Sequence, residues 1–169
     1  MHTVRGVAEA AERSSKPRSG QPGGGEAERS MVKKQQLNDL AERVWSRLRE
    51  QRPEWDAHFG VGSDGDLEVA IPAPPRSRAG QLVLSSSGGS DLWVRFGPEH
   101  MRYAVSDADH MLAVAEQLLS DHALFVVINQ AGRWTATTIM GPGEEPPLKS
   151  GQSAEIVSWS GVRDRVVSR

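Results

Sequence analysis

Residues 91–128 read DLWVRFGPEHMRYAVSDADHMLAVAEQLLSDHALFVVI, and they predict two strands, a helix and a third strand. Apolar and polar residues alternate over 91–96 and again over 100–105, with a Gly97-Pro98-Glu99 interruption between them. This pattern is typical of two antiparallel strands joined by a short turn. Ser106 or Asp107 can then cap a helix, because a short polar side chain accepts hydrogen bonds from its first free N–H groups.

The predicted helix carries an apolar stripe of residues spaced three and four apart, namely Met111, Leu112, Ala115, Leu118 and Leu119. Residues 123–129 follow as a continuous apolar run, which is typical of a strand covered on both faces. Further strands are predicted over residues 67–71, 81–85, 133–140 and 154–160, and another helix over 31–52. The intervals 54–66 and 141–153 are expected to be loops.

The resulting order, α-β-β-β-β-α-β-β-β, places the strands in sequential runs. It favours an α+β fold with a mostly antiparallel sheet of about six to seven strands and two helices. In the strand over 133–140, strict alternation places Trp134, Ala136 and Thr138 on one face.

The chain has 169 residues and no Cys, which predicts a single domain, 31–169, without disulfides or Cys-ligated metals. Residues 14–30 contain no Val, Leu, Ile or aromatic residue, so we expect residues 1–30 to be a disordered tail. Met31 is then an alternative translation start. We find neither a signal peptide nor an apolar run long enough to cross a membrane, and therefore expect a cytoplasmic protein with no membrane partner.

The charges are unevenly distributed. Residues 31–53 hold six basic and three acidic groups, whereas residues 54–169 hold nine basic and fifteen acidic groups. An acidic body repels the phosphates of nucleic acids and attracts a basic partner. The sequence therefore predicts no nucleic-acid partner, although a solvated acidic surface alone also explains the charge.

Residues 60–65 match the G-x-G-x-x-G pattern of dinucleotide-binding proteins. That motif requires a strand before it and a helix after it, whereas here a strand is predicted to follow. A turn is the better interpretation. Asp64, Asp66 and Glu68 lack the remaining ligands of a calcium loop, and no two histidines have the spacing of a helical zinc site. We therefore expect no cofactor and no metal.

Tryptophan and arginine are enriched among the residues that contribute most to binding at protein interfaces. Four such residues lie on the predicted strands, namely Trp93, Arg95, Trp134 and Trp159. They form a candidate binding surface, with the alternative that each tryptophan covers an end of the core. His100 opens a strand next to a turn, and with Arg95 and an acid such as Glu99 it is a candidate centre for a ligand or a reaction.

The stretches DLWVRFGPEHMRY (91–103), AEQLLSDHALFVVI (115–128), RWTATTIMGPGEEP (133–146) and VSWSGVRDR (157–165) are similar to small bacterial proteins that resemble the immunity proteins of polymorphic toxin systems. The resemblance implies an α+β protein that binds and neutralises a cognate toxin without a cofactor. It carries over no catalytic residue and identifies no contact.

The leading hypothesis is a non-enzymatic binding protein of the immunity type, whose partner is a protein such as a basic toxin. The alternative is a small ligand-binding domain or enzyme centred on His100. A third hypothesis is a regulatory adaptor that uses the basic first helix.

Overall fold

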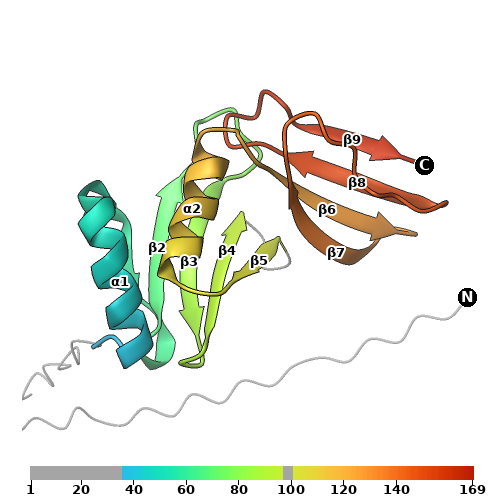
Figure 1. Cartoon of the computed structure of the whole chain (residues 1–169). Helices are drawn as coiled ribbons and strands as arrows, with labels where there is room; N and C mark the ends of the chain where they lie inside the picture. Colours follow the sequence, from blue (N-terminus) through green and yellow to red (C-terminus); the bar gives the residue numbers. More distant parts are fainter. Residues whose placement is uncertain (1–35, 97–100) are drawn as a thin grey trace, which may run out of the picture. The chain divides into compact units, whose positions relative to one another are not determined.

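The computed structural model describes residues 36–96 and 101–169, which belong to one compact unit (Figure 1). The predicted tail over 1–30, the alternative start at Met31 and the candidate residues Glu99 and His100 lie outside these residues. The elements in chain order are α1 (Asp39–Gln51), the 3-10 helix η1 (Pro53–His58), β1 (Phe59–Val61), the 3-10 turn η2 (Ser63–Gly65), β2 (Leu67–Pro72), β3 (Gln81–Ser87), β4 (Asp91–Phe96), β5 (Arg102–Val105), α2 (Ala108–Leu119), β6 (Leu124–Gln130), β7 (Arg133–Met140), β8 (Gln152–Val157) and β9 (Arg165–Ser168).

The predicted α+β class is confirmed, but the strands form two sheets instead of one. The first is an antiparallel meander in the order β1-β2-β3-β4-β5, and the second is antiparallel in the order β7-β6-β8-β9. All seven predicted strands are present. The prediction missed β1 and β9, which have only three and four residues and are too short to show a clear alternation.

Both α-helices cover the same face of the first sheet. The buried stripe of α1 (Ala41, Val44, Trp45, Leu48) and that of α2 (Met111, Val114, Ala115, Leu118) share one core with apolar residues of β2, β3 and β4. Leu84 pairs with Val69 on one side and with Val94 on the other, so these three buried residues form a row across the sheet. Among the described residues, no helix covers the opposite face of this sheet.

Helix α1 begins at Asp39, so the predicted start at residue 31 is wrong for the described residues 36–38, which are not helical. The side-chain oxygen of Asn38 accepts a hydrogen bond from the N–H of Ala41 at 2.9 Å and caps the helix. The N–H of Asn38 itself donates to the carbonyl of Gly65 at 2.8 Å. These two bonds fix the helix start, which the apolar periodicity alone does not locate.

The predicted loop over 54–66 is also wrong in part, because it contains η1, β1 and η2. The G-x-G-x-x-G segment begins with the last two residues of β1 and continues through the β1–β2 connection, so the expected turn is confirmed for residues 62–65 and strand β2 follows it. Gly65 has φ +75°, and an added Cβ would lie 2.5 Å from the carbonyl oxygen of Gln36. The last glycine of the motif therefore allows the close approach of the segment that leads into α1.

The second sheet has a core on each face. Phe125 and Val127 of β6 join the core of the helices and the first sheet, whereas Leu124, Val126 and Ile128 belong to a second core that includes Leu148. The apolar run of β6 is therefore covered on both faces, as its sequence predicts. Leu148 belongs to the predicted loop over 141–153, whose last two residues instead begin β8.

A register shift between Ile128 and Asn129 overturns the predicted alternation of β7. Trp134 pairs with Asn129 and Ala136 pairs with Ile128, so these two β7 residues face opposite sides of the sheet. The indole N–H of Trp134 donates to the Thr137 hydroxyl at 3.0 Å. A bulge of one residue cannot be read from alternation alone.

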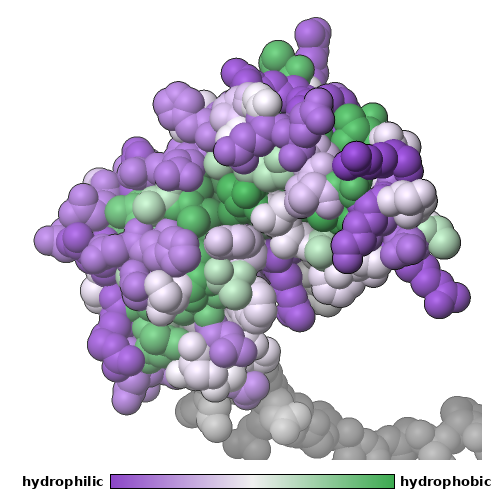
Figure 2. All heavy atoms as spheres, turned by 45° about the vertical axis from the view of Figure 1, so that its right-hand side comes forward, coloured by the Kyte–Doolittle hydropathy of each residue, from purple (hydrophilic) through white to green (hydrophobic). Residues whose placement is uncertain are grey.

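The surface in Figure 2 is largely hydrophilic, with hydrophobic side chains in small separate patches. Among the described residues, the large hydrophobic side chains that are exposed are Trp134, Val162 and Val166. None of the described helices is long and apolar enough to cross a membrane.

Candidate functional site

The face of the first sheet that lies opposite α1 and α2 holds two of the predicted site residues. Trp93 and Arg95 are two positions apart on β4, and they point away from the buried residues Leu92 and Val94. Trp93 pairs with Ser85 of β3, which in turn pairs with Glu68 of β2; Arg95 pairs with Arg102 of β5. We call Glu68, Ser85, Trp93, Arg95 and Arg102 the Trp93 face.

A cation–π contact organises this face. The guanidinium carbon of Arg102 lies 4.5 Å from the centroid of the Trp93 ring. Such a contact stabilises an exposed pair by about 0.5–1 kcal/mol and holds both side chains in one arrangement. Trp93 is only partly buried, so its ring remains accessible to a second molecule.

Arg95 is the most buried charged side chain of the Trp93 face, with 22% of the side chain exposed. Its Nη2 lies 3.6 Å from a carboxylate oxygen of Glu68, a longer contact than the other ion pairs of the described residues. Its Nε is buried and has no hydrogen-bond partner in the part of the chain that the structure describes. Burying a hydrogen-bond donor without an acceptor costs free energy. A ligand that supplies an acceptor here would remove that cost, so this position is a candidate ligand contact.

These side chains line a pocket of about 340 Å³ together with residues of the β1–β2 and β3–β4 connections. Its remaining lining includes Gly62, Ser63, Asp66, Ser86 and Ser87. Ser86 is buried, accepts a hydrogen bond from the N–H of Leu67 at 2.8 Å and donates to Asp66 at 3.4 Å. The amide of Asn38 also donates to Asp66, at 3.0 Å. The floor of the pocket is thus tied to the start of α1.

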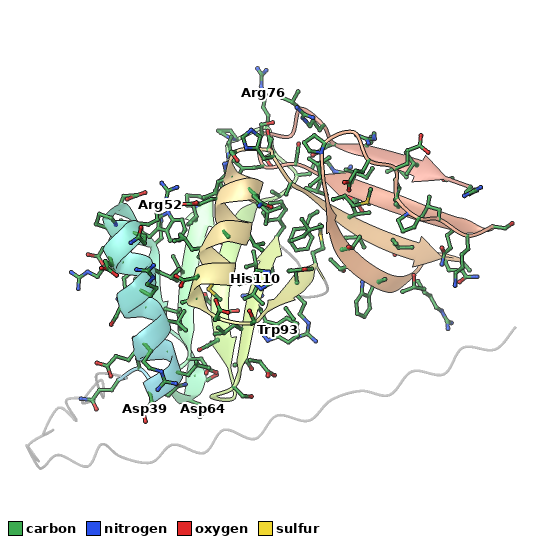
Figure 3. All side chains as sticks on the ribbon, viewed as in Figure 1. Asp39, Arg52, Asp64, Arg76, Trp93 and His110 are labelled. Carbon is green, nitrogen blue, oxygen red and sulfur yellow. The ribbon has the colours of Figure 1, made fainter. Side chains whose placement is uncertain are left out.

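Carboxylates gather where α1 begins. Asp39 and Asp64 lie at the same end of the first sheet (Figure 3), and Asp66 is linked to the same point through Asn38. We call Asp39, Asp64 and Asp66 the acidic end. No ion pair to these three groups is present among the described residues. Asp39 and Asp64 are exposed, whereas Asp66 is half-buried and accepts the hydrogen bonds of Asn38 and Ser86.

Arg47 and Arg49 of α1 and Arg52, which follows the helix, by contrast form ion pairs within the domain. Arg47 contacts Asp109 at 2.7 Å, Arg52 contacts Glu116 at 2.7 Å, and Arg49 contacts Asp56 at 3.0 Å. The bonds to Asp109 and Glu116 raise the pKa of Arg47 and Arg52 respectively. The charges of these three arginines are therefore matched by nearby acids, whereas Arg43 of α1 forms no ion pair among the described residues.

The other predicted site residues lie elsewhere. Trp134 stands exposed on β7 of the second sheet, and Trp159 packs against Phe96 with ring centroids 6.1 Å apart. Neither residue lines the pocket of the Trp93 face. Trp159 thus covers the core, which was the alternative interpretation, while His100 lies outside the described residues.

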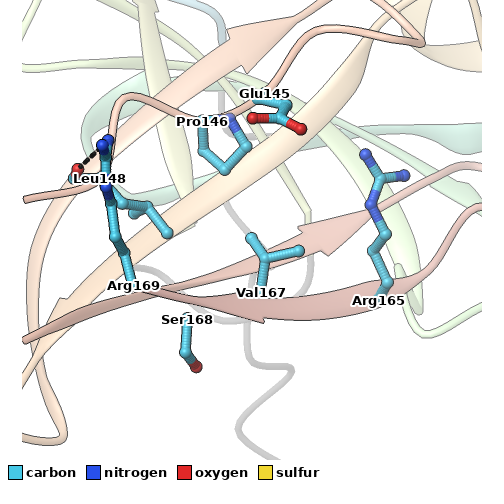
Figure 4. A pocket seen from close by; sticks show the side chains of 7 residues that line it. All are labelled: Glu145, Pro146, Leu148, Arg165, Val167, Ser168 and Arg169. Carbon is cyan, nitrogen blue, oxygen red and sulfur yellow. Dashed lines mark hydrogen bonds between the residues drawn. The ribbon is translucent and has the colours of Figure 1, made fainter.

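A second groove lies on the other sheet, between residues 145–148 and β9 (Figure 4). Its volume is about 530 Å³, and Pro146, Leu148 and Val167 supply its apolar surface. Arg169 donates to the carbonyl of Leu148 at 3.2 Å. The groove contains none of the candidate site residues that the sequence analysis named.

Arg102 is the residue of the Trp93 face that the sequence analysis missed. The sequence held a signal for it, because antiparallel pairing of the two predicted strands 91–96 and 100–105 can place Arg102 opposite Arg95, as β4 and β5 do. Among the described residues, no group of three or more histidines and acids is arranged to hold a metal ion. Comparisons with family models, curated proteins and solved structures found no match for this chain.

Proposed function

We propose that the chain is a non-enzymatic binding protein that docks a basic protein partner over its acidic end, with Trp93 as the central anchor. The observation that carries this proposal is the partly exposed Trp93 ring, held by Arg102 in the same pocket as Asp66 and Glu68. Tryptophan and arginine dominate the energetics of protein interfaces when a partner excludes water from them.

The charge distribution supports a basic partner. Residues 54–169 carry nine basic and fifteen acidic groups, and Arg47, Arg49 and Arg52 are already engaged by acids of the same domain. The carboxylates of Asp39 and Asp64 have no such partner in the described residues, so they are available to accelerate the encounter. Together with the resemblance stated above, this favours an immunity-type protein that neutralises a basic toxin.

The test is affinity capture of the full chain from its own organism, at low and at high salt. We expect the unaltered chain to capture one basic protein in stoichiometric amount. Trp93→Ala is expected not to capture it, whereas Trp134→Ala is expected to capture it, because Trp134 lies outside the Trp93 face. Charge reversal at Asp39 and Asp64 is expected to weaken capture at low salt. A partner that is retained equally by both tryptophan variants contradicts the proposed surface.

The alternative of a small ligand-binding domain or an enzyme centred on His100 has one observation in its favour. Arg95 lines a pocket and carries a buried N–H without a hydrogen-bond partner among the described residues. Under this alternative, Arg95→Gln abolishes binding or turnover of a small molecule, while Trp93→Ala affects it less.

A further inference from the structure

We propose that Arg95 and Arg102 together bind an oxyanion, the phosphate or carboxylate group of a small molecule. This inference goes beyond the proposed function, because it requires no protein partner. Arg95 and Arg102 are direct register partners on neighbouring antiparallel strands and lie on the same face. Like charges in directly opposite positions repel each other, so a negative charge near the pair would be stabilising.

The described residues supply that counter-charge only in part. Glu68 approaches Arg95 at 3.6 Å, and about half of its side chain is exposed to solvent. In the described part of the chain, no carboxylate forms an ion pair with Arg102, which instead rests on the Trp93 ring. The Trp93 face thus holds two guanidinium groups and one carboxylate, which approaches only Arg95.

The buried Nε of Arg95 strengthens this argument. Nitrogens of a guanidinium group donate in a planar fork that matches the oxygens of a phosphate or a carboxylate. An oxyanion between the two arginines provides acceptors for both groups, and it offers the Arg95 Nε a partner that the described residues lack. The Trp93 ring keeps the Arg102 group in position, so little side-chain freedom is lost on binding.

The pocket has room and further donors for such a group. Its volume is about 340 Å³, and Ser85 and Ser87 lie on the same side of β3 and line it. Asp66 also lines the pocket, but Asn38 and Ser86 already donate to its Oδ1. Glu68 is therefore the carboxylate that competes with an incoming oxyanion for Arg95.

The experiment titrates the full chain with inorganic phosphate, and in parallel with acetate, at constant ionic strength set by chloride. Tryptophan fluorescence and indole N–H signals in NMR spectra report binding near Trp93. We expect saturable binding that Arg102→Ala and Arg95→Gln each weaken at least fivefold. Glu68→Gln is expected to tighten it, because the competing charge is removed. Arg133→Ala, an exposed arginine on β7, serves as the matched control and leaves the affinity unchanged.

Saturation by phosphate alone assigns the site to phosphate groups, and saturation by acetate as well assigns it to oxyanions in general. The inference is overturned if neither anion saturates, or if the arginine variants bind as the unaltered chain does. The Glu68→Gln arm remains informative if an arginine variant fails to fold, since unchanged or weaker binding there also contradicts the site. Because no partner is present in this titration, its failure leaves the protein-docking proposal standing, and the reverse also holds.

Discussion

The backbone N–H of Asn38 donates to the carbonyl of Gly65 at 2.8 Å, and this bond ties the first turn of α1 to the β1–β2 connection. Asn38 also caps α1 through Ala41 and donates to Asp66, which lines the pocket of the Trp93 face. The start of the first helix and the floor of the candidate site are therefore one structural unit. Substitutions in this unit are expected to alter the pocket as well as the free energy of unfolding.

Gly65→Ala is predicted to lower the free energy of unfolding strongly. A left-handed conformation costs an alanine about 1–2 kcal/mol, and the new Cβ would also lie 2.5 Å from the Gln36 carbonyl. Gly88→Ala is the matched control, because its φ is +60° and nothing lies near its Cβ position. Urea denaturation of both variants measures the difference. An equal decrease in the free energy of unfolding for the two variants would show that the segment around Gln36 moves aside for the new Cβ without a cost.

Asn38→Ala is predicted to destabilise the domain by about 1 kcal/mol through loss of the helix cap. The amide bond to Asp66 is lost with it. Asn38→Ser retains a capping oxygen, so it is expected to cost less, while it still removes the donor to Asp66. The two variants, compared by denaturant unfolding, separate the cap from the link to the pocket. A serine variant as unstable as the alanine variant assigns the stabilisation to the Asp66 contact.

The pH dependence of stability contains a contribution from Asp107. The backbone N–H of His110 and the hydroxyl of Ser106 lower the pKa of this carboxyl group. A lowered pKa means that the stabilisation is present above the ordinary aspartate pKa of about 3.9 and is lost as the pH falls through the folded value. Asp107→Asn keeps a capping oxygen that does not titrate. We expect its unfolding midpoint to fall less steeply below pH 4, and an identical slope would contradict this assignment.

Phe96 is predicted to be the most sensitive position where the two sheets share a core. It is fully buried, and its ring lies 5.0 Å from that of Phe125 and 6.1 Å from that of Trp159. Phe96→Ala is expected to cost about 3–5 kcal/mol and to change the near-ultraviolet circular dichroism of the tryptophans. Val166→Ala, at an exposed position of β9, is expected to stay within about 0.5 kcal/mol. A mild loss at Phe96 would mean that the two sheets are stabilised independently.

Strong local patterns explain why much of the fold is predictable from sequence. The helix α2 and the covered strand β6 are confirmed, and of the two predicted caps, Ser106 and Asp107, the structure shows Asp107. The predicted α2 stripe is buried at Met111, Ala115 and Leu118, while Leu112 and Leu119 are only partly buried and Val114 was missed. The start of α1 was misplaced because it depends on Gly65, 27 positions from Asn38. The split into two sheets depends on which strands pair with one another. The sequence of a single strand does not show which strand will be its neighbour.

The candidate site was predictable in part for the same reason. Alternation along β4 placed Trp93 and Arg95 together, and the structure confirms that placement. Arg102 and Glu68 joined them only through the register of three neighbouring strand pairs. Trp134 and Trp159 were grouped with them by residue type alone, whereas Trp134 lies on the second sheet and Trp159 packs against Phe96.

The most direct test of the central claim is the dissociation constant of the captured partner for the unaltered chain, for Trp93→Ala and for Trp134→Ala. Truncation of a central anchor costs an interface about 2 kcal/mol or more, or roughly thirtyfold in affinity. We predict a loss of this size for Trp93→Ala and a change of less than about threefold for Trp134→Ala, which lies outside the anchor. Equal affinities for the unaltered chain and Trp93→Ala would contradict the claim that the Trp93 face binds the partner.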